Sequence, residues 1–76
     1  MSQLFSFEWT VGTLAEVLKF FTPDATDKLI DAAARAIVLV KKAFADDPVR
    51  RAAEIGSVIA DLKAGQTPAI LKELTK

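Results

Sequence analysis

Residues 22–45 read TPDATDKLIDAAARAIVLVKKAFA. The proline after Thr22 favours a helix start, because the first position of a helix needs no amide hydrogen. Apolar residues then recur every three or four positions, as they do along one face of an amphipathic helix. The stretch therefore predicts a helix from Pro23 to about Ala45. Its expected core face consists of Leu29, Ile30, Ala33, Ala36, Ile37, Val40 and Phe44.

The same pairing of a capping residue with proline divides the rest of the chain. Asp47 precedes Pro48, and Thr67 precedes Pro68. We therefore expect a helix over residues 48–64, with Gly65 as a left-handed cap after its end, and a helix of two turns over residues 69–76. No linker of glycine and serine separates these segments, so residues 1–76 form a single domain.

The beginning of the chain follows a different pattern. Phe5, Phe7 and Trp9 alternate with polar residues, which is the two-residue period of an extended segment. Thr13 and Glu16 then have the spacing of a capping box. These signals predict an extended segment over residues 1–12, either a lid on the bundle or an arm that adds to a partner, and a bundle over residues 13–76. The expected fold is all-α, a small bundle of three to four short helices with an extended aromatic N-terminal segment.

The composition argues against catalysis and against resident cofactors. The 76 residues include no cysteine and no histidine, so disulfides and the usual zinc, haem and iron–sulfur ligands are excluded. No serine lies in a nucleophile motif, and Gly12, Gly56 and Gly65 are isolated rather than gathered in a phosphate-binding loop. Asp24, Asp27 and Asp31 match no calcium loop. We therefore expect no enzyme activity, no metal, no cofactor and no small-molecule substrate.

Charge and hydropathy limit the compartment and the partners. Ten basic and ten acidic residues give a net charge of zero, so no global field attracts nucleic acid or an anionic membrane. The start of the chain lacks the pattern of a secretory signal. The longest apolar stretch, residues 32–40, is interrupted by Arg35 and is far shorter than a membrane span. We expect a cytoplasmic protein. Peripheral membrane binding through short amphipathic helices ranks last among the functions considered, because acidic residues are mixed into their polar faces.

Small residues recur on the helix expected over residues 48–64. Ala52, Gly56 and Ala60 are spaced by four and form a smooth ridge, separate from a bulky apolar face. Two interpretations account for them: this helix is the central one of the bundle, covered on two sides, or the ridge is a face for self-association. Val38 and Leu39 fall outside the expected core face and are either isolated surface residues or contacts to another chain.

These features favour a non-enzymatic protein–protein interaction module. Such a subunit would self-associate as a homo-oligomer or dock on a larger assembly, as a structural component or a small inhibitor, because a domain of this size buries only about 60% of its surface alone. The alternative is a DNA-binding regulator that uses Lys41, Lys42, Arg50 and Arg51. The residues expected to bind a protein partner are Phe5, Phe7, Trp9, Val38, Leu39, Ala52, Gly56 and Ala60.

Overall fold

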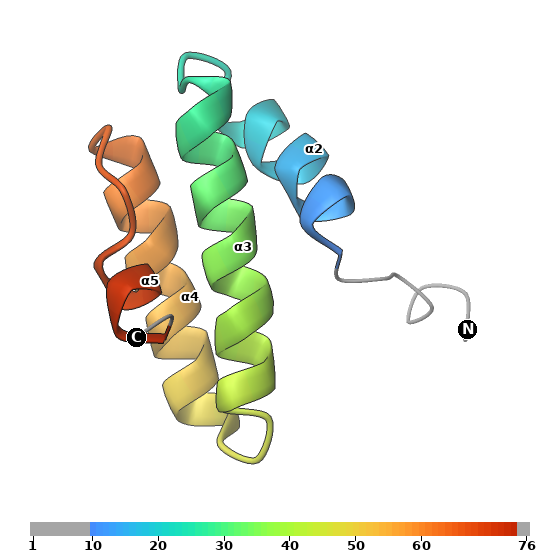
Figure 1. Ribbon diagram of the computed structural model, residues 1–76, viewed down its shortest axis with the longest axis vertical. Coiled ribbons are helices and arrows are strands. Elements are labelled where there is room, and N and C mark those ends of the chain that lie inside the picture. The colour runs from blue at the N-terminus through green and yellow to red at the C-terminus, as the bar shows by residue number, and fades with distance from the viewer. Residues whose placement is uncertain (1–9, 75–76) are drawn as a thin grey trace.

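A computed structural model describes residues 10–74 of the chain as an arrangement of helices (Figure 1). In chain order these are α2 over Val11–Phe21, α3 over Asp27–Ala43, α4 over Pro48–Lys63 and α5 over Ala69–Leu74. Helix α3 lies in the middle, with α2 packed on one side and α4 and α5 on another. The prediction of a small all-α bundle is confirmed. The extended segment expected to contain Phe5, Phe7 and Trp9 lies outside the described residues, apart from its last positions.

Helix α2 begins earlier than the capping box at Thr13 and Glu16 predicts. The hydroxyl of Thr10 accepts a hydrogen bond from the amide of Thr13 at 3.1 Å, which makes Thr10 the N-cap. Val11 and Gly12 therefore belong to the first turn of the helix, which begins two residues before Thr13. Thr10 and Thr13 both have the side chain of a capping residue, and the tertiary fold uses the earlier one.

The start of α3 also differs from the prediction. The hydroxyl of Thr26, not that of Thr22, caps this helix by accepting from the amide of Leu29 at 3.2 Å. Pro23 lies in the turn between α2 and α3 instead of at a first helical position. Thr22 instead ends α2, where both its amide and its hydroxyl donate to the carbonyl of Leu18. The chain needs these turn residues to reverse its direction before α3 can pack on α2.

The ends of the later helices lie closer to the boundaries predicted from the sequence. The Asp47 carboxylate accepts from the amide of Arg50 at 3.0 Å, so α4 begins at Pro48 as predicted. Gly65 has a φ of 74°, the left-handed conformation expected after this helix. The amide of Ala69, at the start of α5, donates to the carboxylate of Asp61 on α4 at 3.1 Å. The side chain of Asp61 thus links the start of α5 to α4.

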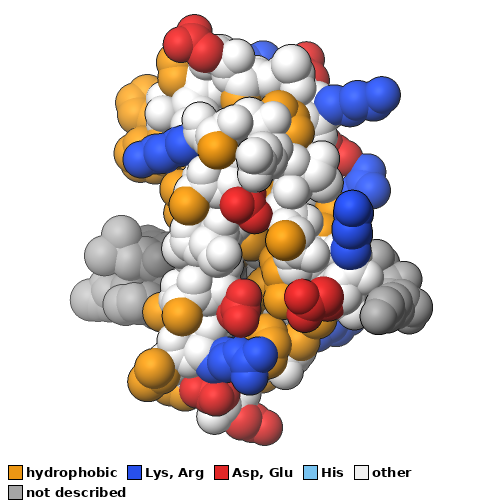
Figure 2. Space-filling model, turned by 90° about the vertical axis from the view of Figure 1, so that its left-hand side faces the viewer, with side chains coloured by type: hydrophobic (Ala, Val, Ile, Leu, Met, Phe, Trp, Pro, Cys, Tyr) orange, Lys and Arg blue, Asp and Glu red, His pale blue; other side chains and the backbone are white. Residues whose placement is uncertain are grey.

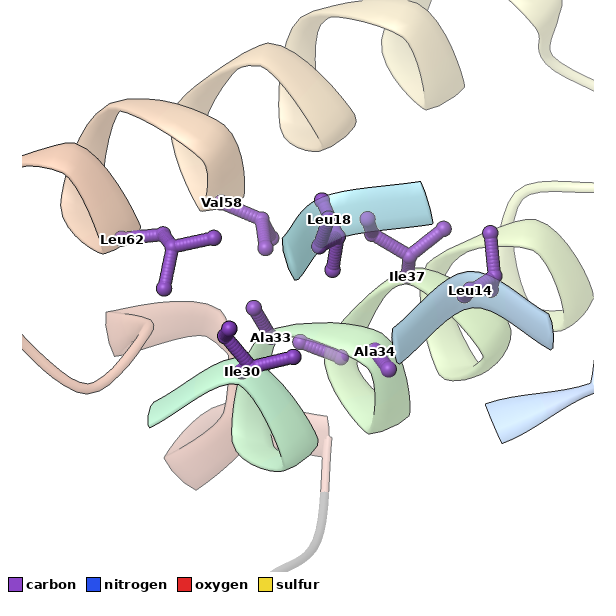
Figure 3. Packing of buried hydrophobic residues seen from close by; sticks show 9 residues of the cluster. Leu14, Leu18, Ile30, Ala33, Ala34, Ile37, Val58 and Leu62 are labelled. Atoms are coloured by element: carbon purple, nitrogen blue, oxygen red, sulfur yellow. The ribbon is translucent and has the colours of Figure 1, made fainter. Parts of the chain in front are cut away.

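The core is organised around α3, so the interpretation of residues 48–64 as the central helix was wrong. Ala33, Ala34 and Ala36 are fully buried, and because successive helical residues turn by about 100° they line more than one side of α3. Figure 3 shows Ala34 beside Leu14 of α2. Ala34 was absent from the predicted core face, whereas Leu29 and Phe44, which were part of it, are only half-buried. The cluster shown in Figure 3 includes Leu14, Leu18, Ile30, Ala33, Ala34, Ile37, Val58 and Leu62.

Enlarging Ala34 tests whether α2 depends on close contact with α3. We expect Ala34→Leu to lower the free energy of unfolding by about 1–3 kcal/mol, because the added methyl groups overpack a site with no exposed surface. The matched control, Ala43→Leu at an exposed position of α3, should change it by less than about 0.5 kcal/mol. Urea unfolding followed by circular dichroism measures both variants. Equal stabilities of the two variants would contradict this packing.

Candidate interaction surfaces

The exposed side of α2 carries bulky apolar side chains. Phe20 is 81% exposed, Phe21 is 70% exposed and Val17 is 38% exposed. We call these three residues the aromatic strip. The rings of Phe20 and Phe21 meet edge to face, with their centroids 5.7 Å apart, so they form one apolar surface. Among the described helices α2 approaches only α3, and the strip is therefore uncovered within residues 10–74.

Helical spacing relates Val17 and Phe21 to Leu14 and Leu18, whereas Phe20 falls outside that spacing. A signal for the strip was nevertheless present. Adjacent residues on a helix point about 100° apart, so Phe20 and Phe21 cannot both face a single neighbouring helix. With Leu14 and Leu18 already buried against α3, the helix has more apolar residues than one contact can cover.

The outward face of α4 has the opposite character. Val49 is 80% exposed, and the exposed positions that follow it on this side are all uncharged and small. Figure 2 looks onto the side of the molecule formed by α4 and α5, where small orange patches alternate with white surface. A methyl group added at Gly56 would meet no atom within 4 Å, so no contact in the described chain requires a glycine there. The outward face comprises Val49, Ala52, Ala53, Gly56, Ser57 and Ala60.

From Val49 to Ala60 the charged residues of α4 lie beside this face, and the exposed Lys63 lies at its C-terminal end. The Arg50 guanidinium pairs with the Glu54 carboxylate at 3.4 Å, and Asp61 is occupied by the amide of Ala69. An ordinary surface helix has its charged residues on the side that points away from the core. On α4 that position is occupied by alanine, glycine and serine, which leaves a shallow surface that another backbone can approach closely.

The structure brings together only some of the predicted partner-binding residues. Ala52, Gly56 and Ala60 share the outward face of α4, as the four-residue spacing implies. Val38 is half-buried and packs against the core, and Leu39 is also half-buried, so neither belongs to that face. Phe5, Phe7 and Trp9 lie outside the described residues.

The basic residues considered for DNA binding serve largely in the turn between α3 and α4. The Arg50 guanidinium stacks 4.8 Å from the ring centroid of Phe44, in addition to pairing with Glu54. Arg51 donates to the carbonyl of Ala45 at 3.1 Å. Lys41 and Lys42 are exposed at the end of α3, where a positive charge complements the helix dipole. Both arginines therefore stabilise the fold locally.

The acidic residues of the described chain do not form a metal site. Asp27 pairs with Lys19 of α2 at 3.3 Å, and Asp31 pairs with Arg35 one turn along α3. Residues 10–74 contain no group of three or more histidine, cysteine or carboxylate side chains arranged to hold a metal ion. Within the same range, no helix has the length and hydropathy needed to cross a membrane.

Comparisons with protein families, with curated proteins and with solved structures find no match for this chain. The candidate interaction surfaces are the aromatic strip of α2 and the outward face of α4. One is bulky and aromatic, the other is small and uncharged, and they lie on different sides of α3.

Replacing the glycine tests whether the outward face is free within a single chain. We expect Gly56→Ala to raise the free energy of unfolding by about 1 kcal/mol, because alanine loses less backbone entropy in a helix and its methyl group meets open space. Urea unfolding at a low micromolar concentration, where association is weakest, measures this change. An unchanged or lowered stability would show that Gly56 packs against part of its own chain.

Proposed function

We propose that this chain is a non-enzymatic protein-interaction module, a small cytoplasmic helical subunit that self-associates or docks on a larger assembly. The observation that supports this proposal most strongly is the pair Phe20 and Phe21, both more than two-thirds exposed and in contact with each other. Scattered exposed apolar residues are ordinary on soluble proteins, whereas contiguous ones mark surfaces that bind.

The energetics favour burial of the aromatic strip by a partner. Removing a phenylalanine side chain from water is worth about 2 kcal/mol, so two of them supply a substantial part of an association free energy. A small domain also has a limited core of its own. A partner that covers the strip therefore buries apolar surface that remains exposed to water in the described fold.

The outward face of α4 supports the same proposal in a different way. Small side chains permit a second helix to approach closely, and the absence of charge from Val49 to Ala60 on this side lowers the cost of removing water. Each surface alone suits a helix-to-helix contact. No comparable observation favours the DNA-binding alternative, because Arg50 and Arg51 have partners within their own chain.

Light scattering after size exclusion tests self-association. We expect the wild-type chain to increase in mass with concentration, and Phe20→Ser with Phe21→Ser to remain monomeric with little change in helix content, because both rings are largely exposed. Lys28→Ser and Lys42→Ser, also at exposed positions, provide a control that should associate like the wild type. A wild-type chain that stays a folded monomer at every concentration would contradict self-association.

A further inference from the structure

The aromatic strip and the outward face of α4 differ in shape in a way that suits mutual contact. The strip projects two phenylalanine rings, whereas the outward face has no side chain larger than serine between Ala52 and Ala60. Packing of one helix on another needs ridges on one surface and grooves on the other. Two strips placed together would have only large side chains in contact, and two outward faces would have only small ones. Neither pairing of like surfaces combines ridges with grooves.

The charges beside the two surfaces are also complementary. Glu16 lies one turn before Phe20 on α2, and Lys63 lies one turn after Ala60 on α4. Both are exposed, and within residues 10–74 neither forms an ion pair. The bulky surface thus has an acidic residue at its edge, and the small surface has a basic one.

We propose that the aromatic strip of α2 docks on the outward face of α4 of a second copy of this chain. The two helices run antiparallel, so that Phe20 and Phe21 lie over Gly56 and Ala60 while Glu16 faces Lys63. Gly56 lets the rings approach the helix backbone, which accounts for a glycine in the interior of a helix. This arrangement rests on the proposed function, since it specifies how the subunit self-associates.

Helices α2 and α4, which carry the two surfaces, lie on different sides of α3, so one copy can use both at once (Figure 1). Contacts between unlike surfaces are heterologous and give closed rings or open chains, not an isolated symmetric dimer. Each added copy presents a fresh strip at one end and a fresh outward face at the other. Assembly should therefore extend beyond two copies as concentration rises.

Mixing two variants, each with one damaged surface, tests this arrangement. The first carries Phe20→Asp with Phe21→Asp and keeps its outward face. The second carries Gly56→Glu, which meets open space in its own chain and keeps the strip. We expect each variant alone to be a folded monomer, and an equimolar mixture to form a 1:1 dimer and nothing larger in light scattering, because only one pair of intact surfaces remains.

The charge pair supplies an independent readout. Glu16→Lys or Lys63→Glu alone should weaken self-association by about two- to five-fold, as expected for an exposed ion pair. Both changes in the same chain reverse the pair and should restore the wild-type affinity. Circular dichroism shows whether each variant remains helical, so that a failure to fold is not mistaken for a loss of contact.

Other outcomes overturn the arrangement in distinguishable ways. If either surface variant alone assembles like the wild type, the contact is between like surfaces or elsewhere, and this arrangement fails while the proposed function stands. If the wild-type chain is monomeric at every concentration, both self-association and this arrangement are contradicted. If Phe5→Ser, Phe7→Ser and Trp9→Ser combined convert such a monomer into an assembly, the chain's own first residues, not a second copy, cover the strip.

Discussion

Packing of helices against the alanine-rich surface of α3 is the contact on which the rest of the structure depends. Ala33, Ala34 and Ala36 have no exposed surface, and their small side chains let neighbouring helices lie close to α3. Within residues 10–74, α2 packs on α3 and on no other helix, whereas α4 and α5 also contact each other. The buried residues of the core cluster come from α2, α3 and α4, and Pro68 before α5 is buried as well. The core is therefore shared, but every other helix is positioned relative to α3.

This arrangement leaves apolar residues of α2 and α4 uncovered within residues 10–74. Helix α2 has Leu14 and Leu18 against α3, and Phe20 and Phe21 remain outside that contact. Helix α4 buries Val58 and Leu62 and exposes a face of small residues. A helix in the centre of a bundle would have both faces covered, as α3 does. The exposed surfaces of α2 and α4 therefore follow from their position at the sides, and both suit contact with another polypeptide.

Much of the fold follows from local signals, because helix periodicity and the Asp47–Pro48 cap depend on neighbours in the chain. The start of α4 at Pro48 and the left-handed Gly65 were both predicted. The choice of Thr26 over Thr22 as a cap depends on how the chain turns, and the bond from Ala69 to Asp61 joins residues eight apart. The burial of Ala34 can be predicted only when the position of α2 relative to α3 is known. For the same reason sequence periodicity found the spacing of Ala52, Gly56 and Ala60 but not the exposure of Phe20.

The central claim is that the exposed surfaces of α2 and α4 are covered together when copies of the chain meet. A dilution series of ¹H–¹⁵N correlation spectra tests it residue by residue. We expect the amide signals of residues 16–21 and 52–63 to change in chemical shift or to broaden as the protein concentration rises. The midpoint concentration should be the same for both groups, and the signals of the buried residues of α3 should change little. Changes confined to one of the two helices, changes centred elsewhere, or spectra independent of concentration would contradict it.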